Sequence, residues 1–132
     1  MEYFEISNKI MNIRKGSGSS VILNIKGGNI REGSGSSVLF NIKGGDIREK
    51  NGSKVIMNIR GNDIRKGNGS SVLYNIKGDD IRERSGSSVL FNIKSSDIRR
   101  GNGSSVLYNA TGRLSNEEIA AVLYALREIR AH

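Results

Sequence analysis

The stretch Val38-Leu39-Phe40-Asn41-Ile42-Lys43, followed by Asp46-Ile47-Arg48, is the unit from which this chain of 132 residues is built. Its asparagine recurs at a constant spacing of 17 residues, at Asn24, Asn41, Asn58, Asn75, Asn92 and Asn109. No insertion or deletion interrupts this spacing, so one short unit is copied in tandem. We therefore expect a stack or a ring of near-identical pieces.

Each unit contains a long and a short segment that read as β-strands. The long segment is rich in β-branched and aromatic residues, which favour strands. Alternation places Val38, Phe40 and Ile42 on one face and Leu39 and Asn41 on the other. The Leu39 position forms an apolar row on the outer face, which we expect to be covered by a partner, by a helix or by a bend that turns it inward.

Glycine-rich turns separate the segments, and two architectures fit two strands in 17 residues. In a hairpin meander or barrel, Arg60 would pair with Asp63 and Ile59 would lie opposite Ile64. A three-residue loop at 67–69 would then shift each repeat by about four residues, a steep shear for a sheet.

A solenoid needs no such shift, and it would stack the asparagines into a hydrogen-bonded ladder. We therefore predict an all-β tandem repeat in residues 1–110, a β-solenoid of 17-residue coils with residues 4–9 as a degenerate first copy. The alternative is an antiparallel β-hairpin meander or barrel. The recurrent Val-Leu-Tyr-Asn-Ile-Lys-Gly core of residues 4–110 resembles short-period β-solenoid repeat proteins of bacterial type. That resemblance implies a repeat architecture and carries no activity.

Residues 111–132 break the repeat and predict an amphipathic helix. Ser115 and Glu118 have the spacing of a capping box, and apolar residues recur at helical spacing up to about Ala131. Arg127 and Arg130 are expected near the end of this helix, where they would complement its dipole. We expect the helix to cap the repeat domain. Alternatively, Leu123, Leu126 and Ile129 form a self-association face, and an open sheet edge at the N-terminal end could pair with a second copy.

Two rows of cations are the strongest candidate for a binding site. The candidate polyanion-binding residues are Lys26, Lys43, Arg60, Lys77 and Lys94 in one row, with Lys9 before them, and Arg31, Arg48, Arg65, Arg82 and Arg99 in the other, with Arg14 before them. Stacked like charges repel, so each row needs a counter-charge. Aspartates such as Asp46, two residues before Arg48, could supply it internally, and an external phosphate or sulfate polymer could supply it from outside.

Composition argues against catalysis. The chain has no Cys and one His, His132, so it predicts no disulfide, no metal site, no cofactor and no catalytic residues. It also predicts no small-molecule substrate, no signal peptide and no membrane span, which leaves the compartment unknown, with the cytoplasm as the default. The net charge of +8 favours polyanions as partners.

We therefore expect a non-enzymatic structural or adhesive scaffold that presents a repetitive surface and that could form homo-oligomers. The alternative function is a polyanion-binding module, for nucleic acid or a sulfated or phosphorylated polymer, that uses the Lys and Arg rows.

Overall fold

The computed structural model describes residues 10–50, 52–84 and 86–131, so the expected first copy at residues 4–9, with Lys9, and the terminal His132 lie outside the described residues. The described ranges form twelve β-strands and one α-helix. In chain order these are β1 Ile10–Lys15, β2 Val21–Lys26, β3 Asn29–Glu32, β4 Val38–Lys43, β5 Asp46–Glu49, β6 Val55–Arg60, β7 Asp63–Lys66, β8 Val72–Lys77, β9 Asp80–Glu83, β10 Val89–Lys94, β11 Asp97–Arg100, β12 Val106–Ala110 and α1 Asn116–Ala125.

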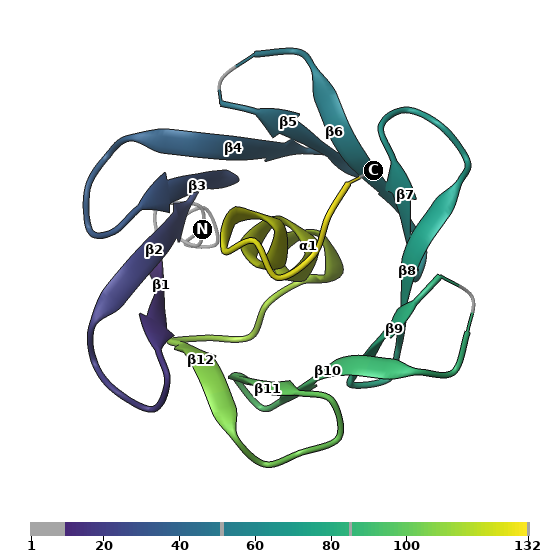
Figure 1. The fold of residues 1–132 in the computed structure, drawn as a ribbon. Coiled ribbons are helices and arrows are strands. Elements are labelled where there is room, and N and C mark those ends of the chain that lie inside the picture. The colour runs from purple at the N-terminus through teal and green to yellow at the C-terminus, as the bar shows by residue number, and fades with distance from the viewer. Residues whose placement is uncertain (1–9, 51, 85, 132) are drawn as a thin grey trace, which may run out of the picture.

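The strands form a closed antiparallel barrel in which β1 pairs with both β2 and β12 (Figure 1). The predicted β-solenoid is therefore wrong, and the barrel named as the alternative is the observed architecture. Both edges of every described strand are paired, whereas the open edge that we expected at the N-terminal end falls on residues 2–6, outside the described residues.

The barrel consists of six blades of two strands each, and in five of them a long strand of six residues pairs with a short strand of four. Five blades are consecutive hairpins, from β2–β3 to β10–β11, and the sixth joins β12 to β1 from opposite ends of the chain. We call the loop that follows each short strand a petal, for example residues 33–37. The petals point away from the centre of the ring (Figure 1). We call the end of the barrel at which the petals connect the strands the petal end. The opposite end, where two-residue turns join the strands of each hairpin, is the turn end.

Within a blade, a two-residue turn joins the strands in the register that we expected for the alternative meander or barrel. Arg60 pairs with Asp63, and Ile59 pairs with Ile64. Gly61 begins this turn with a φ of 60°, a left-handed conformation that glycine adopts without a steric penalty. The tight turn thus follows from local chemistry.

Between blades, a β-bulge changes the expected register. Ile64 pairs with Tyr74 and Arg65 pairs with Val72, which leaves Leu73 without a partner in the ladder. Ile76 is the repeat equivalent of Ile59, and it lies two residues beyond Tyr74, so each repeat slips by two residues instead of four. Our expected slip was too large by two residues. The connection is one residue longer than a loop of residues 67–69, so Arg65 pairs with Val72 and not with Ser71, and the bulge absorbs the second residue. This smaller slip lets the sheet tilt and close.

The bulge also accounts for the apolar row that we assigned to the outer face. It falls on the Leu39 position of the repeat, and these side chains are half-buried against the core. The members of the row are Leu39, Ile56, Leu73, Leu90 and Leu107. We had expected this row to be covered by a partner, by a helix or by a bend that turns it inward, and the bend is what the structure shows.

The repeated asparagines do not form a ladder, because equivalent residues are separated by an intervening short strand. Asn58 Nδ2 instead donates to the carbonyl oxygens of Gly67 and Gly69, at 2.7 and 3.0 Å, in the petal of its own blade. Asn109 on β12 makes the same bonds to Gly16 and Gly18, across the closure of the ring. Asn24 and Asn92 also make both bonds, whereas Asn41 and Asn75 each donate to one petal carbonyl, that of Lys50 and that of Arg84.

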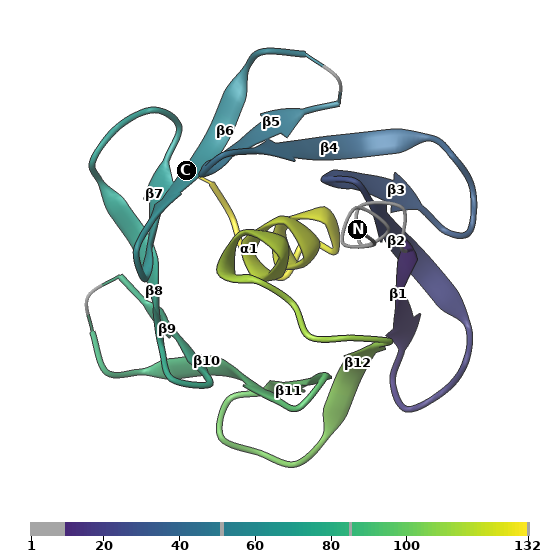
Figure 2. The same cartoon turned by 180° about the vertical axis from the view of Figure 1, so that it is seen from behind.

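The core lies inside the ring, where the inward face of the sheet meets α1 (Figures 1 and 2). The isoleucines of the short strands, such as Ile47 and Ile64, are 0% exposed. Val122 and Leu123 of α1 are also 0% exposed. A barrel of twelve strands is wider than the eight-stranded barrels that side chains alone can fill, so the helix supplies the missing core.

The capping box of α1 is confirmed, but the helix is shorter than predicted. Ser115 and Glu118 exchange bonds with each other's backbone N–H groups. The helix ends at Ala125, because Arg127 adopts a φ of 63° and Glu128 N–H donates back to the carbonyl of Leu123 at 2.8 Å. Arg127 and Arg130 therefore lie beyond the helix and not in its last turn.

The asparagine–petal bonds predict a position-specific loss of stability. Asn58→Ala leaves two petal carbonyls without a donor at a site where the side chain is 4% exposed. We expect the free energy of unfolding to fall by about 1–3 kcal/mol, measured by urea denaturation. The control is Asn68→Ser in the same petal, which introduces the serine that Ser17 and Ser34 provide at this position in other petals. Equal losses for both variants would contradict a structural role for Asn58.

In two other petals, a substitution is expected to increase stability. Lys50 and Arg84 adopt φ values of 49° and 51° at the position where other petals have glycine. Replacing either with glycine should raise the free energy of unfolding by about 1 kcal/mol, because the left-handed conformation costs a residue with a Cβ roughly that much. The reverse change, Gly33→Ala, should lower it, since Gly33 has a φ of 56° and open space around a Cβ. A destabilised Lys50→Gly variant would contradict this explanation.

Candidate functional site

The arginine row lies on the outer wall of the barrel, in the middle of the short strands. Arg48 pairs with Asn41 of its own blade, and alternation directs it away from the inward Ile47. The Arg48, Arg82 and Arg99 side chains keep 27%, 23% and 26% of their surface exposed. Arg31 and Arg65 occupy equivalent positions.

The internal counter-charge that we expected is present but loosely held. The guanidinium groups of Arg48, Arg82 and Arg99 lie 3.9–4.0 Å from the carboxylates of Asp46, Asp80 and Asp97. At half-exposed sites such long ion pairs contribute little to stability. The Nε atoms of all six repeat arginines, from Arg14 to Arg99, are buried without a hydrogen-bond partner.

The second row lies at the turn end, beside the two-residue turns. Lys43 is the cross-strand neighbour of Asp46, and Lys77 is the cross-strand neighbour of Asp80. Lys43, Arg60, Lys77 and Lys94 are exposed, whereas Lys26 is half-buried. The two cation rows therefore share one wall with a row of carboxylates, and this pattern repeats from blade to blade.

One stretch of this wall is hollowed into a shallow groove of about 240 Å³ between the fourth and fifth hairpins. It is lined by Asp79, Asp80, Asn92, Lys94, Arg99, Asn102 and Gly103. The groove combines groups of both charges with amides, so it suits a polar surface rather than an apolar one.

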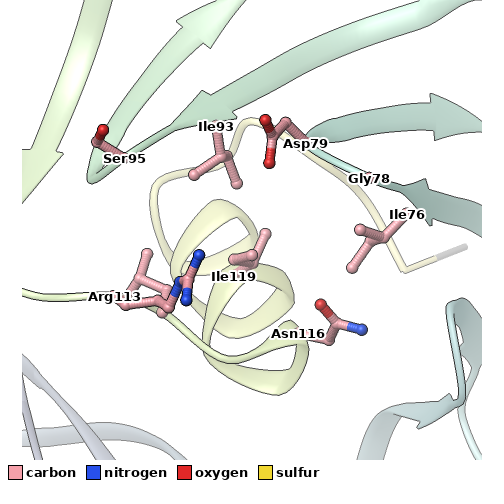
Figure 3. A pocket seen from close by; sticks show the side chains of 9 residues that line it. Ile76, Gly78, Asp79, Ile93, Ser95, Arg113, Asn116 and Ile119 are labelled. Carbon is pink, nitrogen blue, oxygen red and sulfur yellow. The ribbon is translucent and has the colours of Figure 1, made fainter.

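A pocket of about 200 Å³ opens at the turn end of the barrel, between the turns and the start of α1 (Figure 3). Asp79 and Arg113 lie on opposite sides of it, and Ile119 of α1 lies between them (Figure 3). Asn116 Nδ2 is 3.4 Å from the Gly61 carbonyl, which ties the helix to this end.

A larger pocket of about 570 Å³ opens at the petal end. It is lined by Glu32, Leu39, Phe40, Tyr124, Ala125, Arg127, Ile129 and Arg130. Sequence reasoning did not predict this pocket, because it depends on where the helix lies inside the ring. The only signal in the sequence is that the Phe40 position varies between repeats, as Leu23, Met57, Tyr74, Phe91 and Tyr108.

The residues proposed for self-association lie mostly inside the chain's own barrel. Leu123 is 0% exposed and Ile129 is 3% exposed, while Leu126 is half-buried and packs against the core. Their contacts within one chain are thus established, and association through them stays a prediction. In the described ranges, no cluster of His, Cys, Asp or Glu has the composition of a metal site, and no helix is long and apolar enough to cross a membrane.

Two tyrosines of the inward face fix the tail that follows α1. Tyr108 OH donates to Glu128 Oε2 at 2.6 Å, and Tyr74 OH accepts from the Arg130 N–H at 3.0 Å. Both tyrosines point inward, as the sequence predicts. Burial, together with the hydrogen bond to the Glu128 carboxylate, raises the pKa of Tyr108 to about 12.

This raised pKa predicts how stability depends on pH. The unfolded chain loses the Tyr108 proton near pH 10 and the folded chain only near 12, so the contribution of Tyr108 is complete below pH 10 and is lost between 10 and 12. Tyr108→Phe should therefore be less stable than the wild type at pH 8, and the difference should shrink above pH 10. Urea denaturation at pH 8, 9.5 and 10.5 measures this, and a constant difference would contradict it.

Comparison with known families agrees with this geometry. A family model described as a 6-fold beta flower protein matches residues 39–130. No curated protein and no solved structure matches the chain. The matched region covers more than half of the chain and extends from the second hairpin through α1 into the tail. With six blades in a closed ring and a helix at its centre, the chain belongs to the 6-fold beta flower proteins.

Proposed function

We propose that this protein is a non-enzymatic scaffold that presents one polar surface repeatedly around its outer wall. The observation that carries the proposal is the repetition itself, since each hairpin places a lysine or arginine, an acidic or amide side chain and an arginine at equivalent positions. The family description names a shape and no activity.

The closed ring supports multivalent binding to a partner that is itself repetitive. Each blade offers only exposed or half-exposed polar groups, and such contacts are individually weak. Several weak contacts on one rigid body act together, because the first contact raises the effective concentration of the others. The asparagine–petal bonds support this by tethering each petal to its own blade.

A polyanion is the second candidate partner, and the arginine row favours it. The aspartates beside Arg48, Arg82 and Arg99 lie 3.9–4.0 Å from the guanidinium groups, so the ion pairs that these partly exposed groups make are long ones. Guanidinium groups bind phosphate and sulfate through paired N–H donors. The exposed Lys row would add charge at the turn end, in keeping with the net charge of +8.

Binding to heparin and to double-stranded DNA over a salt series tests both candidates. The variant Lys43→Ser/Arg60→Ser/Lys77→Ser removes three exposed cations from neighbouring blades at the turn end. The control Lys15→Ser/Lys54→Ser/Lys66→Ser removes three exposed charges near the petals. Polyanion binding predicts that affinity falls steeply with salt and that only the turn-end variant has a shallower slope, by roughly one unit per lost contact.

The single variant Lys43→Ser separates multivalent from single-site binding. Multivalent binding predicts that the loss of affinity grows more than in proportion as Arg60 and Lys77 are changed as well. If neither heparin nor DNA binds at low salt, the polyanion-binding function is rejected. The remaining proposal is then a scaffold that binds an uncharged repetitive partner. Equal slopes for the triple variant and its control would reject the turn-end row as the contact.

A further inference from the structure

The petal-end pocket breaks the symmetry of the barrel at one blade. Phe40 and Phe91 occupy the same position in the repeat, yet Phe91 is 4% exposed and Phe40 is only partly buried, as Tyr74 and Tyr108 are at the same position. Repetition cannot explain this difference, because the two hairpins have the same Val-Leu-Phe-Asn-Ile-Lys sequence. Tyr74 and Tyr108 use their hydroxyl groups in hydrogen bonds to the tail, whereas the partly buried Phe40 ring has no polar group and lines a pocket.

The helix creates the apolar part of the pocket. Tyr124 meets Phe40 edge to face, with the ring centroids 5.2 Å apart and the planes at 60°. Leu39 and Ile129 complete the apolar lining. The volume of about 570 Å³ lies within the range of small-molecule sites, which combine an apolar lining with a few polar groups.

Two arginines supply the polar part. Arg127 and Arg130 are exposed at the edge of this pocket, where Glu32 is the opposing charge. Arg127 has a φ of 63° at the end of the helix, a position where glycine is usual. Such backbone strain is compatible with a role for the Arg127 side chain at the pocket, although Lys50 and Arg84 adopt the same conformation in petals. The hydrogen bond from Arg130 N–H to Tyr74 OH fixes the neighbouring backbone.

We propose that the petal-end pocket binds one small organic anion with an apolar body. The apolar body would lie against Phe40 and Tyr124, and its carboxylate, sulfonate or phosphate would bind Arg127 and Arg130. The proposed ligand is anionic because two guanidinium groups and one carboxylate give the rim of the pocket a net positive charge. Because its lining includes the helix and its tail, this site occurs once in the described part of the chain and does not repeat with the blades of the outer wall.

Titration with anilinonaphthalene sulfonate tests the proposal, with phenylnaphthylamine as the neutral probe of similar shape. We expect saturable binding of the anionic probe at one site per chain. Arg127→Gly/Arg130→Ser should weaken it by roughly tenfold, the effect of losing a charge-assisted hydrogen bond, and should leave the neutral probe unaffected. This variant should fold, because glycine relieves the strain at position 127 and Arg130 bonds Tyr74 through its backbone.

Two further variants complete the design. Lys77→Ser/Lys94→Ser removes the same charge from the outer wall and should change the affinity of neither probe. Ala125→Leu adds volume in the lining and should weaken both probes. The proposal is overturned if no saturable binding occurs, if six equivalent sites titrate, or if binding is indifferent to the Arg127/Arg130 and Ala125 variants. It is also overturned if the outer-wall variant weakens the anionic probe equally.

Discussion

Closure of the barrel depends on the β-bulge at the start of each long strand. Without the bulge, the odd and even positions of successive strands would exchange faces, or the sheet would slip by four residues in each repeat. With it, Ile47 faces Met57 across neighbouring blades while the slip is limited to two residues. A small and constant slip accumulates evenly around the ring, which allows β12 to meet β1 in the register of the other blades.

The asparagines support the same geometry at the petals. A bulged connection leaves loop carbonyls that the strand ladder cannot satisfy, and buried carbonyls need donors. Asn24 and Asn58, at 2% and 4% exposed, supply two bonds each to their petals. The invariant residue of the repeat therefore acts within one blade, and the constant spacing reflects identical blades rather than contact between asparagines.

The helix gives a symmetric barrel an asymmetric interior. Six nearly equal blades surround one helix, so equivalent positions meet different neighbours. Tyr108 meets Glu128, Tyr74 meets the backbone of Arg130, and Phe40 meets Tyr124 beside a pocket. The outer wall keeps the repetition of the sequence, whereas the interior loses it. A repetitive partner on the wall and a single small ligand at the petal end are therefore compatible proposals.

The sequence by itself determined the features that depend on neighbouring residues. These are the strands and their inward isoleucines and the capping box of Ser115 and Glu118, while the two-residue turn between Arg60 and Asp63 was expected only for the alternative barrel. It also placed the cation rows on the outer face, because alternation along a strand is a local property. Only the tertiary structure decided between a solenoid and a barrel, where the helix lies and where it ends. One residue absorbed by a bulge changes the register of every later strand, and the petal-end pocket exists only where residues 32–40 and 124–130 meet. Such contacts join segments far apart in the chain, so no local pattern encodes them.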